Sequence, residues 1–373
     1  MKQTAYFSRI LLVLFTLLIS STPLIFSALP HNNVECAGLC TTTKSITLET
    51  LYGTFEIDEP VILEILESAP FQRLKNVYQL GIWRYAVKDD NFTRYDHSIG
   101  VFALVRKHGG SLKEQIAALL HDVSHTVFSH VGAFFFVSDA KAMDKFQDDT
   151  HEWYLEHTGL AAILHKYGYT VEEILPKHPE FKRLEQDLPM LCADRIDYNI
   201  RGALWDNLIT AEQAKNIVES LAFDNDTWYF TDQQCARKIA ETSCSMTSGI
   251  WGSAENFLTG QWLAKALKRA VQLDLITRND VYFSTDTAVW KILCSSGDPE
   301  LQKNIYQIEH CYDFFVIDDQ NFTEICYGKF RGINPLVKTE DGLQHLTDID
   351  PEYAQIYNST KEIISKGWKV RIL

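Results

Sequence analysis

Apolar residues recur every three or four positions from residue 60 to about residue 292, which is the period of an amphipathic helix. Pro60 suits the first turn of a helix, and Ser111 with Glu114 three positions later has the form of a capping box. Thr210 to Ser220 has the same kind of capped helical pattern. The pattern therefore predicts a large region built mainly from helices.

The period changes after Gly297-Asp298-Pro299. Three later segments have strand-like composition, namely Tyr312 to Ile317, Thr323 to Phe330 and Trp368 to Leu373. We therefore predict a mainly α fold, with a helical domain over residues 49–298 and a small α+β subdomain over residues 299–373.

The N-terminal segment has the pattern of an export signal. Lys2 and Arg9 precede a stretch from Ile10 to Ile19 that is apolar except for one threonine. The cleavage motif at residues 26–28 is poor because its first residue is bulky, so an uncleaved membrane anchor over residues 10–29 stays open. We expect residues 1–29 to be a signal peptide or anchor, residues 30–48 to be a linker, and the protein to be periplasmic, secreted or membrane-anchored. The third alternative is that this segment is an apolar helix that is neither a signal peptide nor an anchor.

Composition and charge narrow the function classes. The 373 residues are 46% hydrophobic and 23% charged, as in globular proteins, and the net charge is -14. An acidic surface argues against a nucleic-acid polymer as the main ligand, but a small phosphorylated ligand remains compatible. Eight cysteines are too few for a disulfide scaffold of this length, although Cys36 and Cys40 could pair in an oxidising compartment.

Histidines carry the candidate chemistry. Six of the twelve lie between residues 97 and 151, and an apolar run ending in Leu119-Leu120 leads straight into His121-Asp122. Burying such polar groups is costly unless they are paired or bind a metal. His121 and His125 are four positions apart, which predicts a shared helix face. Histidine and aspartate together, with His97 upstream and Asp194 downstream, suit Mn, Fe, Co, Ni or Zn.

These motifs together resemble the HD-domain phosphohydrolases, and within them the deoxynucleoside triphosphate triphosphohydrolases (the dGTPase-like branch). The resemblance covers residues 50–205 well and residues 206–290 loosely. It rests on the motifs Phe71-Gln72-Arg73-Leu74, Gln79-Leu80-Gly81, Arg94-Tyr95-Asp96-His97-Ser98, the string from His121 to His130, His151-Glu152 and Asp194-Arg195-Ile196-Asp197-Tyr198.

The resemblance implies a role for each matching position. It implies a helical HD fold and a divalent metal held by four ligands, which are His97, His121, Asp122 and Asp194. The catalytic residues that it implies are His125, His130, His151 and Glu152. It also implies substrate contacts from Arg94, Gln79, Arg195 and Tyr198.

The sequence also departs from the dNTP-cleaving relatives. Gly202 stands where they carry an aspartate that reads the deoxyribose, and Ala133 stands where an acidic residue usually accompanies the second histidine. The segment from Ser253 to Leu258 lacks the basic cluster that grips a triphosphate. The metal site is therefore better supported by the sequence than the dNTP substrate.

We interpret the chain as a metal-dependent phosphohydrolase of a nucleotide, with cleavage of dNTP to deoxynucleoside plus triphosphate as the first specific candidate. A phosphomonoesterase or phosphodiesterase acting on another nucleotide is the alternative enzyme. A nucleotide-binding sensor without turnover, and an interaction protein of the cell envelope, are the non-catalytic alternatives. Relatives of this branch often assemble, so a homo-oligomer also stays open.

Overall fold

The structure is a computed structural model that describes residues 44–88, 91–137 and 140–373. Residues Lys44 to Leu373 form one compact unit. The predicted signal or anchor, most of the predicted linker, and Cys36 with Cys40 lie outside the described residues. In the described part, no helix is long and apolar enough to cross a membrane, and six cysteines are free thiols.

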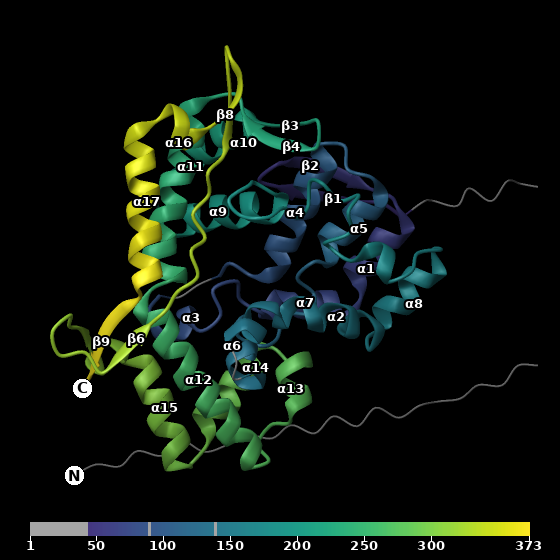
Figure 1. The fold of residues 1–373 in the computed structure, drawn as a ribbon. Helices are drawn as coiled ribbons and strands as arrows, with labels where there is room; N and C mark the ends of the chain where they lie inside the picture. The colour runs from purple at the N-terminus through teal and green to yellow at the C-terminus, as the bar shows by residue number, and fades with distance from the viewer. Residues whose placement is uncertain (1–43, 89–90, 138–139) are drawn as a thin grey trace, which may run out of the picture. The chain divides into compact units, whose positions relative to one another are not determined.

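Helices dominate the unit, as the sequence predicts (Figure 1). The first part contains β1 (Ile46–Thr50), β2 (Gly53–Ile57), α1 (Pro60–Glu67), α2 (Ala69–Arg73), η1 (Leu74–Asn76), α3 (Trp83–Ala86), α4 (Arg94–Lys107), α5 (Leu112–Leu120), α6 (Val131–Phe136), α7 (Ala140–Glu156), α8 (Gly159–Lys166), η2 (Glu172–Ile174) and α9 (Ala193–Trp205).

The second part of the described chain contains further helices and seven more strands, β3 to β9. It contains α10 (Ala211–Ser220), β3 (Leu221–Asp224), β4 (Thr227–Phe230), α11 (Gln233–Met246), the π-helical turn η3 (Thr247–Trp251), α12 (Ala254–Gln272), α13 (Arg278–Phe283), α14 (Asp286–Ser295), α15 (Pro299–Glu309), η4 (Cys311–Asp313), β5 (Phe315–Ile317), β6 (Glu324–Cys326), β7 (Leu336–Thr339), β8 (Gly342–His345), α16 (Leu346–Ile349), α17 (Pro351–Lys366) and β9 (Trp368–Ile372).

The helix ends follow the predicted chemistry, with one exception. Pro60 begins α1, and Thr210 with Gln213 forms a complete capping box at α10. Ser111 caps α5 by accepting from the Glu114 N–H, but the Glu114 carboxylate accepts from the Arg183 N–H at 2.8 Å instead of closing the box. A tertiary contact therefore takes over the second half of that predicted motif.

The three C-terminal strands are confirmed as β5, β6 and β9, each shorter than predicted. They form a small antiparallel sheet in the order β5-β9-β6. A second sheet has the order β3-β4-β7-β8, and β4 pairs with β7 in parallel. The C-terminal region thus shares a sheet with the helical region, and the predicted boundary at residues 298 and 299 stays a prediction.

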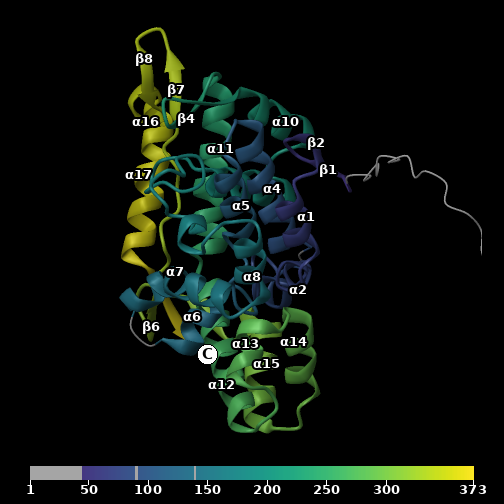
Figure 2. The same ribbon diagram turned by 90° about the vertical axis from the view of Figure 1, so that its right-hand side faces the viewer.

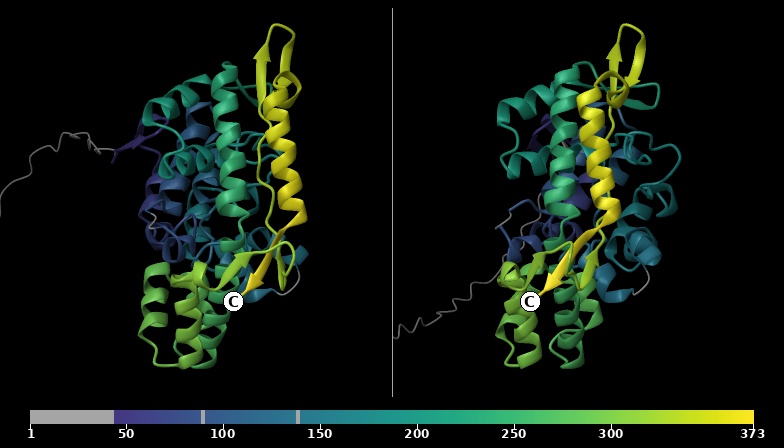
Figure 3. Two further views of the ribbon diagram at one scale, coloured as in Figure 1. Left: turned by 90° about the vertical axis from the view of Figure 1, so that its left-hand side faces the viewer. Right: turned by 60° about the vertical axis from the view of Figure 1, so that its left-hand side comes forward.

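Two apolar cores hold the unit together. The larger is built around α4, α5, α9 and α11, which pack on one another. The smaller lies where α12, α14 and α15 gather at one end (Figure 2). The long helices α11 and α17 run side by side along the unit, and the chain between β6 and β7 passes close to them (Figure 3).

The segment between α5 and α6 is irregular, and this corrects one prediction. Helix α5 ends at Leu120, so His121 and His125 do not share a helix face. Phe128 and Ser129 both have φ of 56°, in the left-handed region that is costly for ordinary residues. The buried Asp286 carboxylate stabilises this turn by accepting from the Phe128 N–H at 2.7 Å.

Arg73 fixes the same segment from the other side. Its guanidinium donates to the carbonyls of Val123 at 3.0 Å and His125 at 2.6 Å. Gly81 packs directly on the Phe128 carbonyl, where a Cβ would clash. The histidine-bearing segment is therefore held rigidly by residues that are distant in the sequence.

Candidate active site and metal centre

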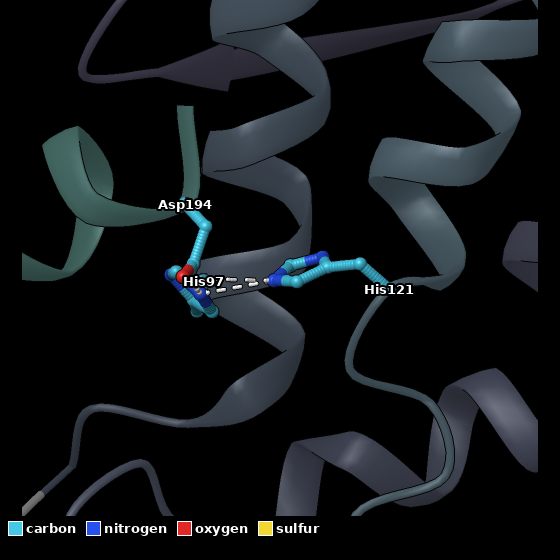
Figure 4. A group of neighbouring side chains, drawn as sticks. All are labelled: His97, His121 and Asp194. Atoms are coloured by element: carbon cyan, nitrogen blue, oxygen red, sulfur yellow. Dashed lines mark hydrogen bonds and ion pairs between the residues drawn. The ribbon is translucent and has the colours of Figure 1, made fainter. Parts of the chain in front are cut away.

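Three of the four predicted metal ligands meet at one point (Figure 4). His97 lies in the first turn of α4, His121 directly follows α5, and Asp194 lies in the first turn of α9. Nε2 of His97 lies 3.1 Å from Nε2 of His121 and 2.9 Å from Oδ1 of Asp194. Candidate ligand atoms of all three residues lie within 4.8 Å of one another.

The outer nitrogens of both imidazoles are fixed by hydrogen bonds. Nδ1 of His121 donates to the Ala118 carbonyl at 2.8 Å, because a carbonyl can only accept. Nδ1 of His97 donates to the Asp197 carboxylate at 2.7 Å. Both Nε2 atoms therefore face each other and the Asp194 carboxylate, an orientation that suits the binding of a cation between them.

Electrostatics also favour a cation here. Burial opposes a charge on His97, which is 0% exposed, yet hydrogen bonds to Asp194 and Asp197 raise its pKa to about 10. Two imidazoles and a carboxylate are a donor set suited to a first-row transition metal. The residues present thus fit a divalent metal ion.

Asp122, the fourth predicted ligand, lies beside this group. Its Oδ2 is 3.6 Å from Nε2 of His97, and its Oδ1 is 3.7 Å from Nε2 of His121. Arg94 forms a buried ion pair with Asp122, and Nε2 of His125 lies 3.1 Å from Oδ1. Burial opposes ionisation of Asp122, but the charge of Arg94 and the hydrogen bond from His125 outweigh it and hold the pKa of the carboxyl well below its usual range.

His125 and His130 form an edge-to-face pair with ring centroids 5.1 Å apart. His125 is buried, and burial lowers its pKa to about 4, so it is neutral at pH 7. Its Nδ1 has no hydrogen-bond partner among the described residues. His130 is exposed to the pocket described below.

His151 and Glu152 both lie on α7 but differ in exposure. His151 is buried with Nδ1 2.8 Å from the Ser124 hydroxyl, while Glu152 is exposed. A polar hollow on the metal side is lined by both of them together with His121, Asp122, His125 and Lys177. The structure therefore brings the predicted pair to the metal side of the site.

A second hollow, which we call the aromatic pocket, shares no lining residue with the polar hollow among the described residues. Its walls include Phe92, Phe134, Tyr198, Trp205 and Trp251. The predicted residues Gln79, His130 and Tyr198 all line it. The Tyr198 ring stands edge-on to Trp251, with centroids 5.2 Å apart, and the Gln79 side-chain oxygen has no partner among the described residues.

The two predicted substrate arginines are engaged with the protein. Arg94 is 2% exposed and donates to the Ser129 hydroxyl at 2.8 Å besides its ion pair with Asp122. The Arg195 guanidinium donates to the carbonyls of Met190 and Gln186 at 2.6 and 2.7 Å. Substrate contact by either residue stays a prediction.

Comparisons with known proteins establish the family. The HD domain family model matches residues 94–200, which span α4 to α9 and all four predicted ligands. The chain is 32% identical over 325 residues to the uncharacterized protein YdhJ of Bacillus subtilis, covering 87% of this chain and 98% of that one. It is 30% identical over 271 residues to the metal-dependent phosphohydrolase cns2 of Cordyceps militaris, covering 70% and 76%. The chain belongs to the HD-domain phosphohydrolases.

More distant similarities agree with this family. The deoxynucleoside triphosphate triphosphohydrolase SAMHD1 of Homo sapiens is 29% identical over 154 residues, or 35% of this HD-domain phosphohydrolase and 24% of that protein. A hypothetical protein from Aquifex aeolicus has the same fold, with a TM-score of 0.61 at 19% identity over 86% of this chain and 99% of that one.

Several residues of this HD-domain phosphohydrolase site escape sequence reasoning. Tyr52 lies in the N-terminal hairpin, and its hydroxyl donates to the Asp197 carboxylate at 2.8 Å. Arg201 donates to the same carboxylate at 2.9 Å. Arg331 lines the aromatic pocket from the segment between β6 and β7. Only the Arg331 segment carries a sequence signal, since glycines at 328 and 332 bracket it.

Proposed function

We propose that this HD-domain phosphohydrolase hydrolyses a nucleotide. The observation that supports this proposal is the closeness of the metal cluster to two hollows. His121 and Asp194 line the polar hollow, and the ring of Tyr198, in the wall of the aromatic pocket, lies with its centroid 6.4 Å from that of the His97 ring. The aromatic walls suit a planar base, and the cluster suits a phosphate held at a metal.

The chain's own residues divide the work. A divalent metal held by His97, His121, Asp194 and Asp122 would supply a Lewis acid for the phosphate and lower the pKa of water. His125 donates Nε2–H to Asp122, which leaves the lone pair of Nδ1 free to accept a proton. Its low pKa keeps the ring neutral at pH 7.

Two specific reactions are candidates, and the first is dNTP triphosphohydrolysis. The partial matches to dNTP triphosphohydrolases, together with the presence of His125, His130, His151 and Glu152, support cleavage of dNTP to deoxynucleoside plus triphosphate.

The scarcity of cations supports a substrate with fewer phosphates. Among the described residues that line the two hollows, the only Lys or Arg side chains are Lys177 and Arg331, and Lys177 is paired with Asp148. Hydrolysis of a phosphomonoester or phosphodiester of another nucleotide is therefore the second candidate.

Hydrolysis of a nucleotide panel tests the proposal. The full chain loaded with Mn or Fe is incubated with dNTPs, NTPs, monophosphates and cyclic nucleotides, and phosphate and triphosphate release are measured. We expect the wild-type chain to hydrolyse at least one class of nucleotide. In Asp194→Asn the rate should fall by at least about 100-fold, and the bound metal should be lost with it. Asp206→Asn, which removes a surface ion pair with Lys88, is the matched control and should keep both.

The outcomes distinguish the two candidate reactions from each other and from a sensor without turnover. Triphosphate released from dNTPs supports the first candidate, and activity limited to monophosphates or cyclic nucleotides supports the second. Bound metal and bound nucleotide without any turnover would contradict the proposal and favour a sensor.

A further inference from the structure

The chain between β6 and β7 brings a positive charge to the aromatic pocket. Arg331 lies in this segment and lines the pocket with Gln79, His130 and Tyr198. Burial raises the pKa of Tyr198 to about 12, and the Arg331 charge offsets part of that rise. The Tyr198 ring in turn lies 6.4 Å from that of the predicted ligand His97.

The backbone around Arg331 is held in place. Gly328 packs against Gly252 so closely that a Cβ at position 328 would clash with the Gly252 backbone. The Ser243 hydroxyl donates to the Arg331 carbonyl at 3.3 Å, and the Tyr353 hydroxyl donates to the carbonyl of the buried Ile333. Because both sides of the residue are anchored, the Arg331 side chain is presented to the pocket from a fixed base.

The charge of Arg331 is not neutralised by the protein. No carboxylate pairs with its guanidinium in the described part of the chain, and no Asp or Glu is among the described residues that line the pocket. Arg94 and Arg195, by contrast, are already engaged with Asp122 and with backbone carbonyls. A half-buried arginine without an acidic partner is a site for an anion.

We propose that Arg331 binds an anionic group of the substrate, while the surrounding aromatic walls hold a heteroaromatic ring. This inference rests on the proposed nucleotide hydrolysis and adds a recognition residue from the C-terminal segment. A guanidinium fork matches the geometry of a phosphate, which can accept two parallel hydrogen bonds from it. Lysine at this position keeps the charge but loses the fork.

The experiment uses two probes that cannot be hydrolysed further, inorganic phosphate and deoxyadenosine. Binding of each to the metal-loaded full chain is followed by tryptophan fluorescence, because Trp205 and Trp251 line the pocket. We expect Arg331→Gln to weaken phosphate binding by about 10- to 100-fold and Arg331→Lys to recover part of the loss. Deoxyadenosine binding should stay within about twofold in both variants, because that probe has no charge.

Lys338→Gln is the matched control, because it removes one positive charge from an exposed position on β7. It should leave phosphate binding unchanged. Equal phosphate binding by the wild-type chain and Arg331→Gln, or no phosphate binding by either, would overturn the inference. Arg331-dependent phosphate binding without deoxyadenosine binding or nucleotide turnover would contradict the proposed function instead, so the two failures are distinguishable.

Discussion

The hydroxyl of Tyr52 donates to the carboxylate of Asp197 over 2.8 Å, joining an N-terminal hairpin to the metal centre. The same carboxylate accepts from Nδ1 of His97 at 2.7 Å and from Arg201 at 2.9 Å. Asp197 is fully buried, so these three donors account for its stability as an anion. Its position decides which nitrogen of His97 faces the candidate metal.

Tyr52→Phe should weaken metal binding without removing a predicted ligand. Losing one of three donors loosens Asp197 and hence the orientation of His97, and such outer contacts change metal affinity by about 10- to 100-fold. Calorimetric titration of the metal-free chain with Mn measures the effect. Tyr167→Phe, whose hydroxyl donates to Glu64 on the surface, is the control. Equal metal affinity in Tyr52→Phe and the wild type would show that the hydrogen bond does not position His97.

Gly100→Ala should be destabilising although alanine is the better helix former. A Cβ at position 100 on α4 would overlap the Asp197 carboxylate and approach Arg201 within 2.9 Å. We expect a loss of about 1 to 3 kcal/mol in the free energy of unfolding, typical of overpacking in a core. Gly159→Ala on α8 has open space around it and should be neutral or slightly stabilising. Thermal unfolding of both variants measures the contrast.

The sequence predicts the parts of this site that are encoded locally. The histidine and aspartate motifs, the capped helix at Thr210 and the C-terminal strands depend on residues close together in the chain. Periodicity misplaces His121 and His125 on one helix because no sequence feature marks the end of α5 at Leu120. Arg73 and Asp286 hold the following irregular segment from far away in the chain.

Long-range partners explain the rest of what sequence reasoning misses. Tyr52 and Asp197 are 145 positions apart, and a single tyrosine in a hairpin gives no sign of such a contact. Arg94 forms its ion pair with the carboxylate of Asp122, and the motif around Arg94 does not reveal this pairing. Only the folded structure shows which charged side chains are paired within the protein and which are available to bind a ligand.

His125→Gln should separate chemistry from metal binding. The variant keeps a polar side chain near Asp122 but cannot take up a proton, and general acid–base catalysis contributes about 10²- to 10⁴-fold to rate. We expect kcat to fall within that range on whichever nucleotide the wild type hydrolyses, with metal content unchanged. Metal content is measured by elemental analysis alongside the rate. A drop in metal content that matches the drop in rate would assign His125 to the metal centre instead.

Acid should destabilise the protein partly through His108, which lies outside the site. Burial, with smaller effects from Lys107 and Arg183, lowers the pKa of His108 to about 4, and its ring packs edge-on against Trp228 with centroids 4.6 Å apart. The unfolded chain binds a proton at this position near pH 6.5, so it takes up protons before the folded chain does. The stability contributed by neutral His108 is therefore complete above pH 6.5 and declines as the pH falls towards 4.

His108→Gln removes that titration and should flatten the pH dependence. Urea unfolding at pH 7.5 and pH 5.0 should show a smaller difference between the two midpoints for His108→Gln than for the wild type. Part of the acid sensitivity will remain, because burial also lowers the pKa of His125 and His151 to about 4. His165→Gln, at an exposed position on α8, should behave as the wild type. If His108→Gln and His165→Gln lose stability equally at pH 5.0, the half-buried histidine at position 108 does not contribute to acid unfolding.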